Sequence, residues 1–572
     1  MRKMFLTKFA FVIFSFFFFS GIVLAQALPP GVEPGAQAER YRKGVLDEQQ
    51  RLDYKKPKAP EVKIEEEQPK PVAEGVAFVL KGVRVVGSTI FTEKDFVKTY
   101  QSYLGKSITF KDIEVIITEI KALYKAKGYL TTSAYLPEQD IKDGQVEIRI
   151  AEGLMGKLRV EGNKWFSESF IRKFIHVKEN ELLNVKTVQR DLLRLNRNYD
   201  LEVKSVVGAG EKPQTSDLTL KAEDHFPWHI GFGEDNQGSR TTGKYRTSLS
   251  IRSSNVSGLG DTLFLNSIYS GKSFGQSANY AIPVGTYGTK IGLDITYFTM
   301  KLGKEYKPSV ITGTTLIGSP YLSWELALSE MYEATMSVGM DIKSIKKKSE
   351  NITTASDQLR LPWFSFNFSK MDSMGQTTFS PQFTFGTEHF LGASKRNHPT
   401  ASRAGTGGFF SKYEQTLGRV QKFLWSSYLS IRCQFQAASH TLPSSEQLQL
   451  GGANSIRGYP EGDFLADNGG SLSVDWVMPM YFIPANWKLA NSEMSLRRQI
   501  EPVLFIDTGG GELKKTNIGE RHSKLLTGVG GGFRVHINKE VYLRLEWAQY
   551  IGNEPEHGSG PSNFYLTFQS EI

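Results

Sequence analysis

Between residues 225 and 572 the chain consists of runs of about ten residues with alternating side chains, separated by turns rich in Gly, Ser and Asn. In residues 244–253, two sets of side chains alternate, namely Tyr245, Thr247, Leu249 and Ile251 with Arg246, Ser248, Ser250 and Arg252. The last run repeats the pattern, with Phe564, Leu566 and Phe568 on one face and Tyr565, Thr567, Gln569 and Glu571 on the other. Because successive side chains of a β-strand point to opposite faces, these runs predict strands with one apolar and one polar face.

These 348 residues are enough for about 14 to 18 strands, since a membrane-spanning strand with its share of turn takes roughly 20 to 24 residues. In lipid, a sheet of that size cannot leave an edge unpaired. We therefore predict a transmembrane antiparallel β-barrel of about 16 strands, with apolar faces toward outer-membrane lipid and polar faces toward a lumen. A soluble propeller or sandwich is the alternative. Three features argue against it, namely an N-terminal segment typical of exported proteins, a strand length suited to spanning a membrane, and the single cysteine, Cys433, which leaves no internal disulfide framework.

The first 27 residues have the layout of a signal peptide. Basic residues precede an apolar run from Phe9 to Leu24, and Ala25 and Ala27 supply the small residues of a cleavage site. A membrane anchor is the alternative, but the run is at the short end of the roughly 17 to 25 residues that cross a bilayer. We expect cleavage after export.

Residues 28–75 are rich in proline and charge, which argues against a packed core in this stretch. A proline-free segment from about Ala36 to Tyr54 is rich in helix formers and predicts a solvated, mostly polar helix. We therefore expect an N-terminal helix and a proline-rich linker. The helix could be a mobile plug or a spacer.

Two α+β units follow, at residues 76–153 and 154–224. Each has the predicted order strand, helix, helix, strand, strand, so the second unit is an internal repeat of the first. A stripe at spacings of three and four marks the second helix of the first unit, and consists of Ile113, Ile116, Ile117, Ile120, Leu123 and Tyr124. That helix should end at Gly128.

Patterns that could indicate catalysis or metal binding are weak. Ser273 lies in a G-x-S-x-G pattern, but strand-like runs on both sides favour a hairpin turn over a nucleophile elbow. His225 and His229 are four residues apart, and Pro227 between them argues against a helical metal site. Lys and Arg are mixed with Asp and Glu at a net charge of +9, which is not typical of a nucleic-acid-binding protein. We expect no enzymatic activity, no cofactor, no metal and no nucleic-acid partner.

The sequence GGANSIRGYPEGD, residues 451–463, places Arg457, Gly458 and Tyr459 at the predicted tip of a hairpin loop. It lacks the Gly-Lys-Ser or Gly-Lys-Thr of a phosphate-binding loop. From spacing alone, an exposed arginine in a turn is the favoured interpretation.

The segment SIRGYPEGD resembles the arginine-glycine-tyrosine motif of the long loop in BamA-like outer-membrane barrels. LFIDTGG, residues 504–510, is similar to the partner motif on a barrel strand, with Asp507 and Gly509 at its centre. Residues 128–153 resemble the end of the first periplasmic POTRA domain of two-partner secretion transporters, the TpsB family of haemolysin secretion/activation proteins. NVSGLGDTL, residues 255–263, resembles the early barrel region of that family.

The resemblance implies tandem POTRA domains followed by an outer-membrane barrel that secretes one large partner exoprotein by the type V route. It implies that the loop folds back into the pore and that Arg457 contacts Asp507 on the barrel wall. A guanidinium and a carboxylate can form two parallel hydrogen bonds, which suits a latch. The sequence departs from the family at its last residue, Ile572, where such barrels often have an aromatic residue; Phe568 is the nearest aromatic on that face.

Besides the exoprotein, which could be an adhesin, a haemolysin or another exported protein, the resemblance implies contact with the barrel-assembly machinery during biogenesis. An alternative function in the same superfamily is the assembly or insertion of other outer-membrane proteins. Such factors more often carry a longer series of POTRA domains than the two expected here. A passive porin or a receptor is a third possibility, but a diffusion pore needs no periplasmic docking units.

Overall fold

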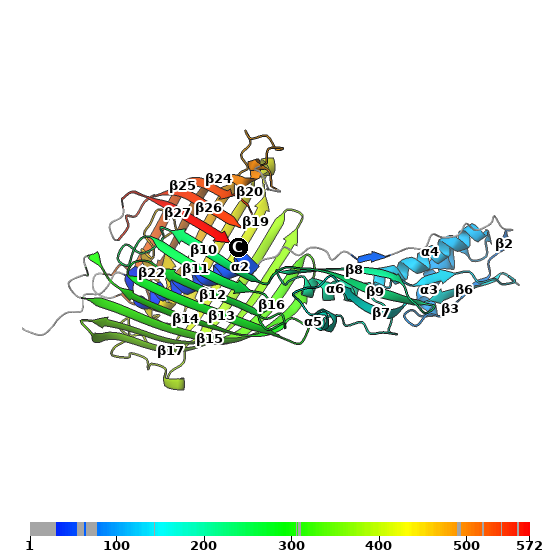
Figure 1. Cartoon of the computed structure of the whole chain (residues 1–572), viewed down its shortest axis with the longest axis horizontal. Helices are drawn as coiled ribbons and strands as arrows, with labels where there is room; N and C mark the ends of the chain where they lie inside the picture. Colours follow the sequence, from blue (N-terminus) through cyan, green and yellow to red (C-terminus); the bar gives the residue numbers. More distant parts are fainter. Residues whose placement is uncertain are drawn as a thin grey trace, which may run out of the picture.

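The computed structural model describes residues 30–53, 62–64 and 77–572, except 142, 305, 307–309, 489–493, 517–519, 539 and 557–559. It is elongated, with a wide barrel at one end and a narrow arm of two α+β units at the other (Figure 1). The expected signal segment, with Ala25 and Ala27, lies outside the described residues.

The barrel is a closed antiparallel sheet of sixteen strands, which confirms the predicted fold. It closes where β10 pairs with β27, between Gly231 opposite Glu571 and Asp235 opposite Thr567. The strands are β10 (Trp228–Asp235), β11 (Arg246–Ser253), β12 (Thr262–Tyr269), β13 (Ser273–Val284), β14 (Thr289–Lys301), β15 (Ile311–Leu328), β16 (Tyr332–Ser349), β17 (Ile352–Asp372), β18 (Gly375–Phe385), β19 (Ser411–Lys422), β20 (Tyr428–Ala438), β23 (Asn468–Val477), β24 (Ile500–Glu512), β25 (Ser523–His536), β26 (Val541–Tyr550) and β27 (Ser562–Glu571).

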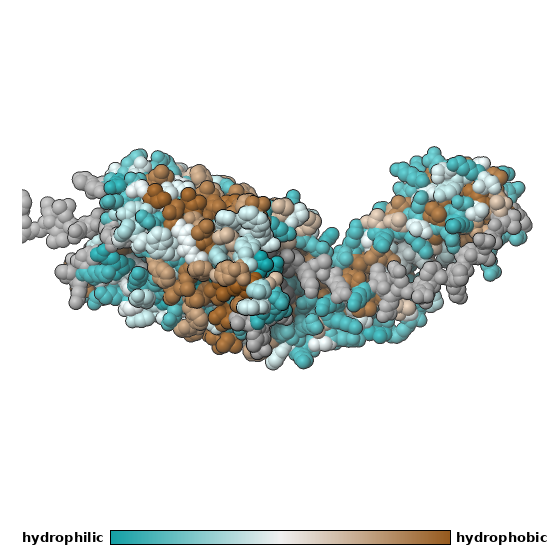
Figure 2. Space-filling model, turned by 90° about the horizontal axis from the view of Figure 1, so that it is seen from above, coloured by the Kyte–Doolittle hydropathy of each residue, from teal (hydrophilic) through white to brown (hydrophobic). Residues whose placement is uncertain are grey.

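The two faces of the barrel strands differ as the alternating sequence predicts. Leu249 and Phe564 are about half exposed on the outside, whereas Tyr565 is buried within the barrel. Hydrophobic residues gather over the flank of the barrel, and the arm is mostly hydrophilic (Figure 2). Among the described residues, none of the helices has the length and hydropathy required to cross a membrane.

The first arm unit packs two helices, α3 (Glu93–Tyr100) and α4 (Phe110–Lys127), on the sheet β3-β6-β5. Its strands are β2 (Phe78–Val79), β3 (Gly82–Val86), β4 (Ser107–Ile108), β5 (Ser133–Tyr135) and β6 (Gln145–Ala151). The isoleucine stripe of α4 is buried in the unit's own core, as its spacing predicts. The helix ends at Gly128, whose φ of 97° is easily adopted by glycine alone.

The second arm unit repeats this order with β7 (Leu154–Glu161), α5 (Glu168–Lys173), α6 (Val185–Leu195), β8 (Leu201–Ala209) and β9 (Thr215–Asp224). A short strand from the linker, β1 (Val62–Ile64), extends its sheet by pairing in parallel with β8. The proline content of residues 28–75 did not predict this strand. Val62 packs against the core of the second unit, so apolar burial offsets the ordering of this short segment.

The second unit is fixed to the near rim of the barrel by ion pairs. Glu325 at the end of β15 accepts hydrogen bonds from Arg194 at 2.9 Å and from Arg197 at 3.0 Å, and its side chain is 3% exposed. His176 bridges Asp191 of the same unit and Thr286 of the turn between β13 and β14. These contacts hold the arm at the entrance of the lumen.

Candidate functional site

The helix α2 (Pro34–Asp53) lies within the barrel lumen (Figure 1). The prediction of a solvated helix was wrong, because Ala36, Ala38, Tyr41 and Val45 are buried. Small side chains let the helix approach the wall closely, and Tyr41 donates a hydrogen bond to the carbonyl oxygen of Asn266 on β12 at 3.0 Å. Tyr41 and Val45 pack with aromatic residues of the wall into one apolar cluster. The apolar side of α2 therefore faces the barrel wall.

Charged groups attach the same helix to β14 and β16. Arg42 donates to both carboxylate oxygens of Asp341, at 2.8 and 3.2 Å, and its Nε lies 3.4 Å from Asp294. Lys343, which is 1% exposed, donates to Glu39 of the helix at 3.1 Å and to Glu446 at 2.7 Å. Buried charges of opposite sign compensate one another here, because each alone would lose its hydration.

The long connection between β20 and β23 folds back into the lumen; we call residues 439–467 the inward loop. It contains the short strands β21 (Leu448–Leu450) and β22 (Phe464–Ala466), which pair with each other. Its apolar residues form a buried cluster with the barrel wall, consisting of Leu450, Ile456, Tyr459, Phe464, Ala466, Leu513 and Leu526. The inward fold predicted for this loop is therefore present in the structure.

Arg457 of the inward loop meets Asp507 on β24 in a two-pronged ion pair. Its Nε donates to Oδ2 at 2.7 Å, and its second guanidinium nitrogen donates to Oδ1 at 2.8 Å. The backbone amide of Arg457 also donates to Oδ2, at 3.0 Å. Arg457 is 3% exposed and Asp507 is fully buried, so the arginine is not the exposed turn residue that spacing alone favours.

Further partners of Arg457 were not predicted from the sequence. Its guanidinium also donates to Asp475 on β23 and to Glu546 on β26, and it stacks over the ring of Phe505 at 3.4 Å. Arg534 on β25 bridges the same two acids and offsets their charge. The only sequence signal for these acids was their lumen-facing position in strands that alternate apolar and polar residues.

The neighbours of Arg457 fix the backbone of the loop. Gly458 has a φ of 97°, its amide donates to the hydroxyl of Tyr565 at 3.0 Å, and its carbonyl accepts from Asn563 at 2.8 Å. The hydroxyl of Tyr459 donates to the carbonyl of Asn553 at 2.8 Å. A Cβ on Gly509 would lie 2.8 Å from the carbonyl oxygen of Gly470, so glycine permits close packing there. All five residues singled out by motif lie at this contact.

The inward loop and α2 also touch each other. Arg40 donates to the side-chain oxygen of Gln449 through two nitrogens, at 2.9 and 2.7 Å. Gln449 in turn donates to the carbonyl of Ala36 at 2.7 Å. At the start of the helix, Gly31 lies directly against the backbone of Gly462. The helix and the loop thus share an interface inside the barrel.

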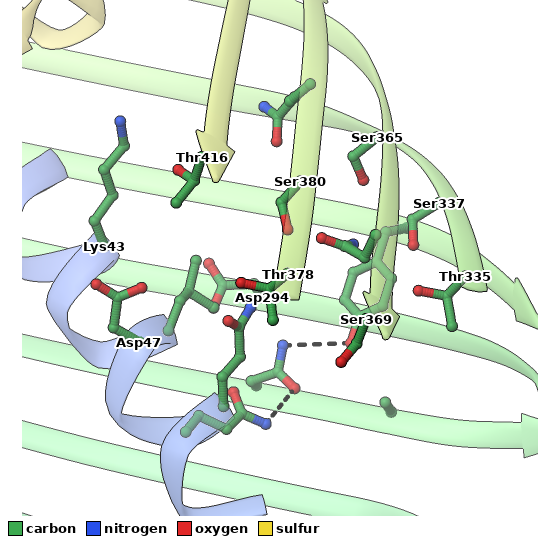
Figure 3. Close-up of a pocket in the computed structure, with 18 of the residues that line it drawn as sticks. Lys43, Asp47, Asp294, Thr335, Ser337, Ser365, Ser369, Thr378, Ser380 and Thr416 are labelled. Carbon is green, nitrogen blue, oxygen red and sulfur yellow. Dashed lines mark hydrogen bonds between the residues drawn. The ribbon is translucent and has the colours of Figure 1, made fainter. Parts of the chain in front are cut away.

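Beside α2 lies a cavity of about 1100 Å³. Its helix side carries charged residues such as Lys43 and Asp47, whereas strands β17 and β18 present hydroxyl and amide side chains such as those of Ser365, Ser369, Thr378 and Ser380 (Figure 3). We call six of the polar residues with which β17 and β18 line the cavity the neutral wall; they are Ser365, Asn367, Ser369, Thr378, Ser380 and Gln382. This lining can donate and accept hydrogen bonds but carries no charge.

Ser273, His225 and His229, which lie in the weak patterns for catalysis or metal binding, form hydrogen bonds within the fold. Ser273 begins β13 directly after the turn from β12, and its hydroxyl bonds that of Ser270. His229 on β10 bonds Asp200 of the second arm unit at 2.9 Å, and the amide of His225 donates to the carbonyl of the same aspartate at 2.8 Å. These contacts join the barrel to the arm.

Comparisons with known proteins identify the family to which this architecture corresponds. Residues 214–535 match the model of the family described as haemolysin secretion/activation protein ShlB/FhaC/HecB. Residues 78–153 match the POTRA domain of ShlB type. Both findings confirm the resemblance stated from the sequence.

The chain matches two transporters over most of their length. The chain is 24% identical over 502 residues to the heme/hemopexin transporter protein HuxB of Haemophilus influenzae, covering 84% of this chain and 85% of that protein. It is 25% identical over 408 residues to the outer membrane transporter CdiB of Dickeya dadantii, covering 68% and 70%.

Solved structures share the fold. CdiB from Escherichia coli superimposes with a TM-score of 0.72 at 19% identity, over 95% of this chain and 99% of that one. BamA from Haemophilus ducreyi, lacking POTRA domains 1–3, gives a TM-score of 0.52 at 14% identity, over 86% and 100%.

Proposed function

The chain belongs to the ShlB/FhaC/HecB family of haemolysin secretion/activation proteins, and from this membership we propose that it secretes one partner exoprotein through its barrel. It is an outer-membrane transporter with its POTRA domains in the periplasm. The observation that carries the proposal is a polar lumen filled from within by α2 and the inward loop, with two periplasmic units at its entrance.

The periplasmic units receive the unfolded exoprotein in this proposal. An extended chain can add to the edge of a sheet by backbone hydrogen bonds. Because β1 covers the β8 edge of the second unit, the sheet of the first unit, β3-β6-β5, offers the better edges. Folding of the exoprotein outside the cell supplies the driving force.

The pair of Arg457 and Asp507 acts as a latch that keeps the inward loop in place. The guanidinium of Arg457 donates five hydrogen bonds, so its position is strongly defined. The loop must loosen for a chain to pass, and the polar surroundings of the pair allow water to replace its contacts. The latch thus holds the resting state without closing the route permanently.

The helix α2 acts as a plug. Its burial and its ion pairs with Asp341 and Lys343 support this role over that of a spacer, which would need no contact with the lumen. In the outer membrane, lipid surrounds the apolar flank, and the barrel-assembly machinery inserts the barrel during biogenesis.

Secretion is tested by comparing the proteins in the culture medium of cells that contain and lack this chain. We expect one large protein to disappear from the medium when the chain is absent and to return on complementation. An unchanged medium, with the barrel present at normal abundance in the complemented cells, would refute the proposal.

The same cells test the alternative function in assembly of other outer-membrane proteins. An assembly factor would lower the abundance of several unrelated barrels when removed, whereas a transporter would leave them unchanged. Comparing the outer-membrane fractions distinguishes the two functions.

A further inference from the structure

The cavity beside α2 extends from the second periplasmic unit to the inward loop. Phe170 and Phe174 of the periplasmic unit line one end, and Gly451 and Asn454 of the inward loop line the other. The cavity therefore leads from the second periplasmic unit to the obstruction that the exoprotein must pass. It does so while α2 occupies the lumen.

The neutral wall carries hydroxyl groups that are free to bind a passing chain. Among the described residues, none forms a hydrogen bond with the side chains of Ser365, Thr378 or Ser380. Ser369 and Thr378 point into the cavity from neighbouring strands (Figure 3). Hydroxyl and amide groups both donate and accept hydrogen bonds, so they can satisfy either polar group of an extended backbone.

The opposite side of the cavity is different in character. Lys43 of α2 pairs with Glu414 at 2.9 Å, and Asp47 lies one turn further along the helix. The apolar side of α2 is seated against β12 and β14, through Phe264 and Phe298. The helix thus covers one part of the wall and leaves the neutral wall open.

Resting on the proposed function in secretion, we propose that the neutral wall binds the first extended segment of the exoprotein while α2 is still in the lumen. The ligand is an unfolded polypeptide, held through its backbone rather than by its sequence. Uncharged partners suit this task, because a charged wall would form ion pairs with passing side chains that must be broken at each step. Weak hydrogen bonds to hydroxyl groups allow the chain to slide.

Photo-crosslinking in secreting cells tests the placement. The probe is p-benzoylphenylalanine, introduced at Thr378 of the neutral wall, at Lys43 of α2, and at two control positions. Phe379 is adjacent on the same strand but faces outward, and Ser248 on β11 faces the lumen outside the cavity. Adducts are identified by mass spectrometry against the protein that disappears from the medium without the transporter.

We expect exoprotein adducts at Thr378 and Lys43 and at least about fivefold fewer at Phe379 and Ser248. As many adducts at Ser248 as at Thr378, or none at Thr378 during active secretion, would overturn the proposal. Adducts at Thr378 without any at Lys43 would overturn the claim that α2 remains in the lumen. Loss of the proposed function is recognised separately, because no protein in the medium would then depend on the transporter.

A charge on the wall tests its chemistry. We expect Ser380→Lys and Ser365→Asp to reduce the exoprotein in the medium about tenfold, and Ser380→Ala to reduce it less than about twofold. Ser248→Lys places the same charge elsewhere in the lumen and should act like Ser380→Ala. Barrel abundance in the outer membrane is measured for every variant. If a charged variant is not inserted, the crosslinking experiment alone tests the proposal. Equal secretion by Ser380→Lys and Ser380→Ala at equal abundance would overturn the proposal.

Discussion

Gly528 on β25 lies directly against the carbonyl oxygen of Arg457, and a Cβ at position 528 would overlap that oxygen. The contact between the barrel wall and the loop therefore depends on Gly528 as well as on Arg457. The neighbouring strand positions, Asp507 on β24 and Gly528, are paired across the sheet. Asp507 binds the guanidinium of Arg457, and the absence of a side chain at Gly528 leaves room for the Arg457 backbone.

Gly528→Ala should displace the inward loop, because Gly528 is held in the sheet between Asp507 and Tyr550, so the loop backbone has to move instead. Overpacking of this kind costs typically about 1 to 3 kcal/mol. We expect faster protease cleavage of the loop in the folded barrel and a larger conductance. Gly318→Ala is the matched control, since nothing lies within 4 Å of its Cβ position. Identical behaviour of the two variants would contradict the contact.

Arg457→Ala should leave buried acids without their partner, and removal of one member of a buried pair costs about 3 to 5 kcal/mol. Water in the lumen reduces this cost. We expect less exoprotein in the medium at normal barrel abundance, and an intermediate level for Arg457→Lys, which keeps the charge but not the paired geometry. Unchanged secretion by Arg457→Ala at normal abundance would remove the latch from the mechanism.

Deletion of residues 36–54 should open the lumen. We expect larger and steadier single-channel currents in planar bilayers than for the complete chain. Arg42→Ala should act in the same direction, because it leaves Asp294 without its ion-pair partner and Asp341 with Lys343 alone. Arg51→Ala removes an exposed contact with Gln569 and serves as the control. Currents unchanged by the deletion would show that α2 is not a plug.

Glu325→Gln should loosen the second periplasmic unit from the barrel rim, since two arginines lose one shared carboxylate. We expect broader distances between spin labels on that unit and on the barrel. Glu330→Gln changes an exposed residue two positions beyond β15 and should leave the distances as they were. A distribution as narrow as that of the control would indicate that other contacts suffice.

Asp112→Asn should weaken the first periplasmic unit in a pH-dependent manner. Hydrogen bonds from the Thr109 amide and hydroxyl lower the pKa of Asp112 below its usual range. A lowered pKa in the folded state adds stability above the unfolded pKa, and this is lost as the pH falls through the folded value. The variant should therefore melt earlier at pH 7, with a difference that shrinks below about pH 4. Asp140→Asn, at an exposed position, is the control; a constant difference would refute the assignment.

The barrel could be predicted because alternation along a strand is a local property that the sequence displays directly. The loop contact required a motif, since a lone arginine between glycines also fits an exposed turn. Asp475 and Glu546 were missed because they lie 18 and 89 residues from Arg457 in the chain. Only the closure of the sheet brings them together.

The position of α2 was not predictable for a related reason. Its charges indicated a solvated helix, but their partners Asp341 and Lys343 are about 300 residues away and belong to the lumen wall. The linker strand β1 was missed because three residues among prolines carry too little periodicity. In both cases the surface that receives the segment exists only after the rest has folded.

The pairing of β1 with β8 has a consequence for the helix that precedes it. Eight residues, 54–61, separate α2 from β1, and a fully extended connection of that length spans at most roughly 30 Å. If the exoprotein displaces α2, as we propose, the helix stays within this radius of the second periplasmic unit while β1 remains attached. Its local concentration at the vacated lumen remains high, so resealing after each secreted molecule is an intramolecular step.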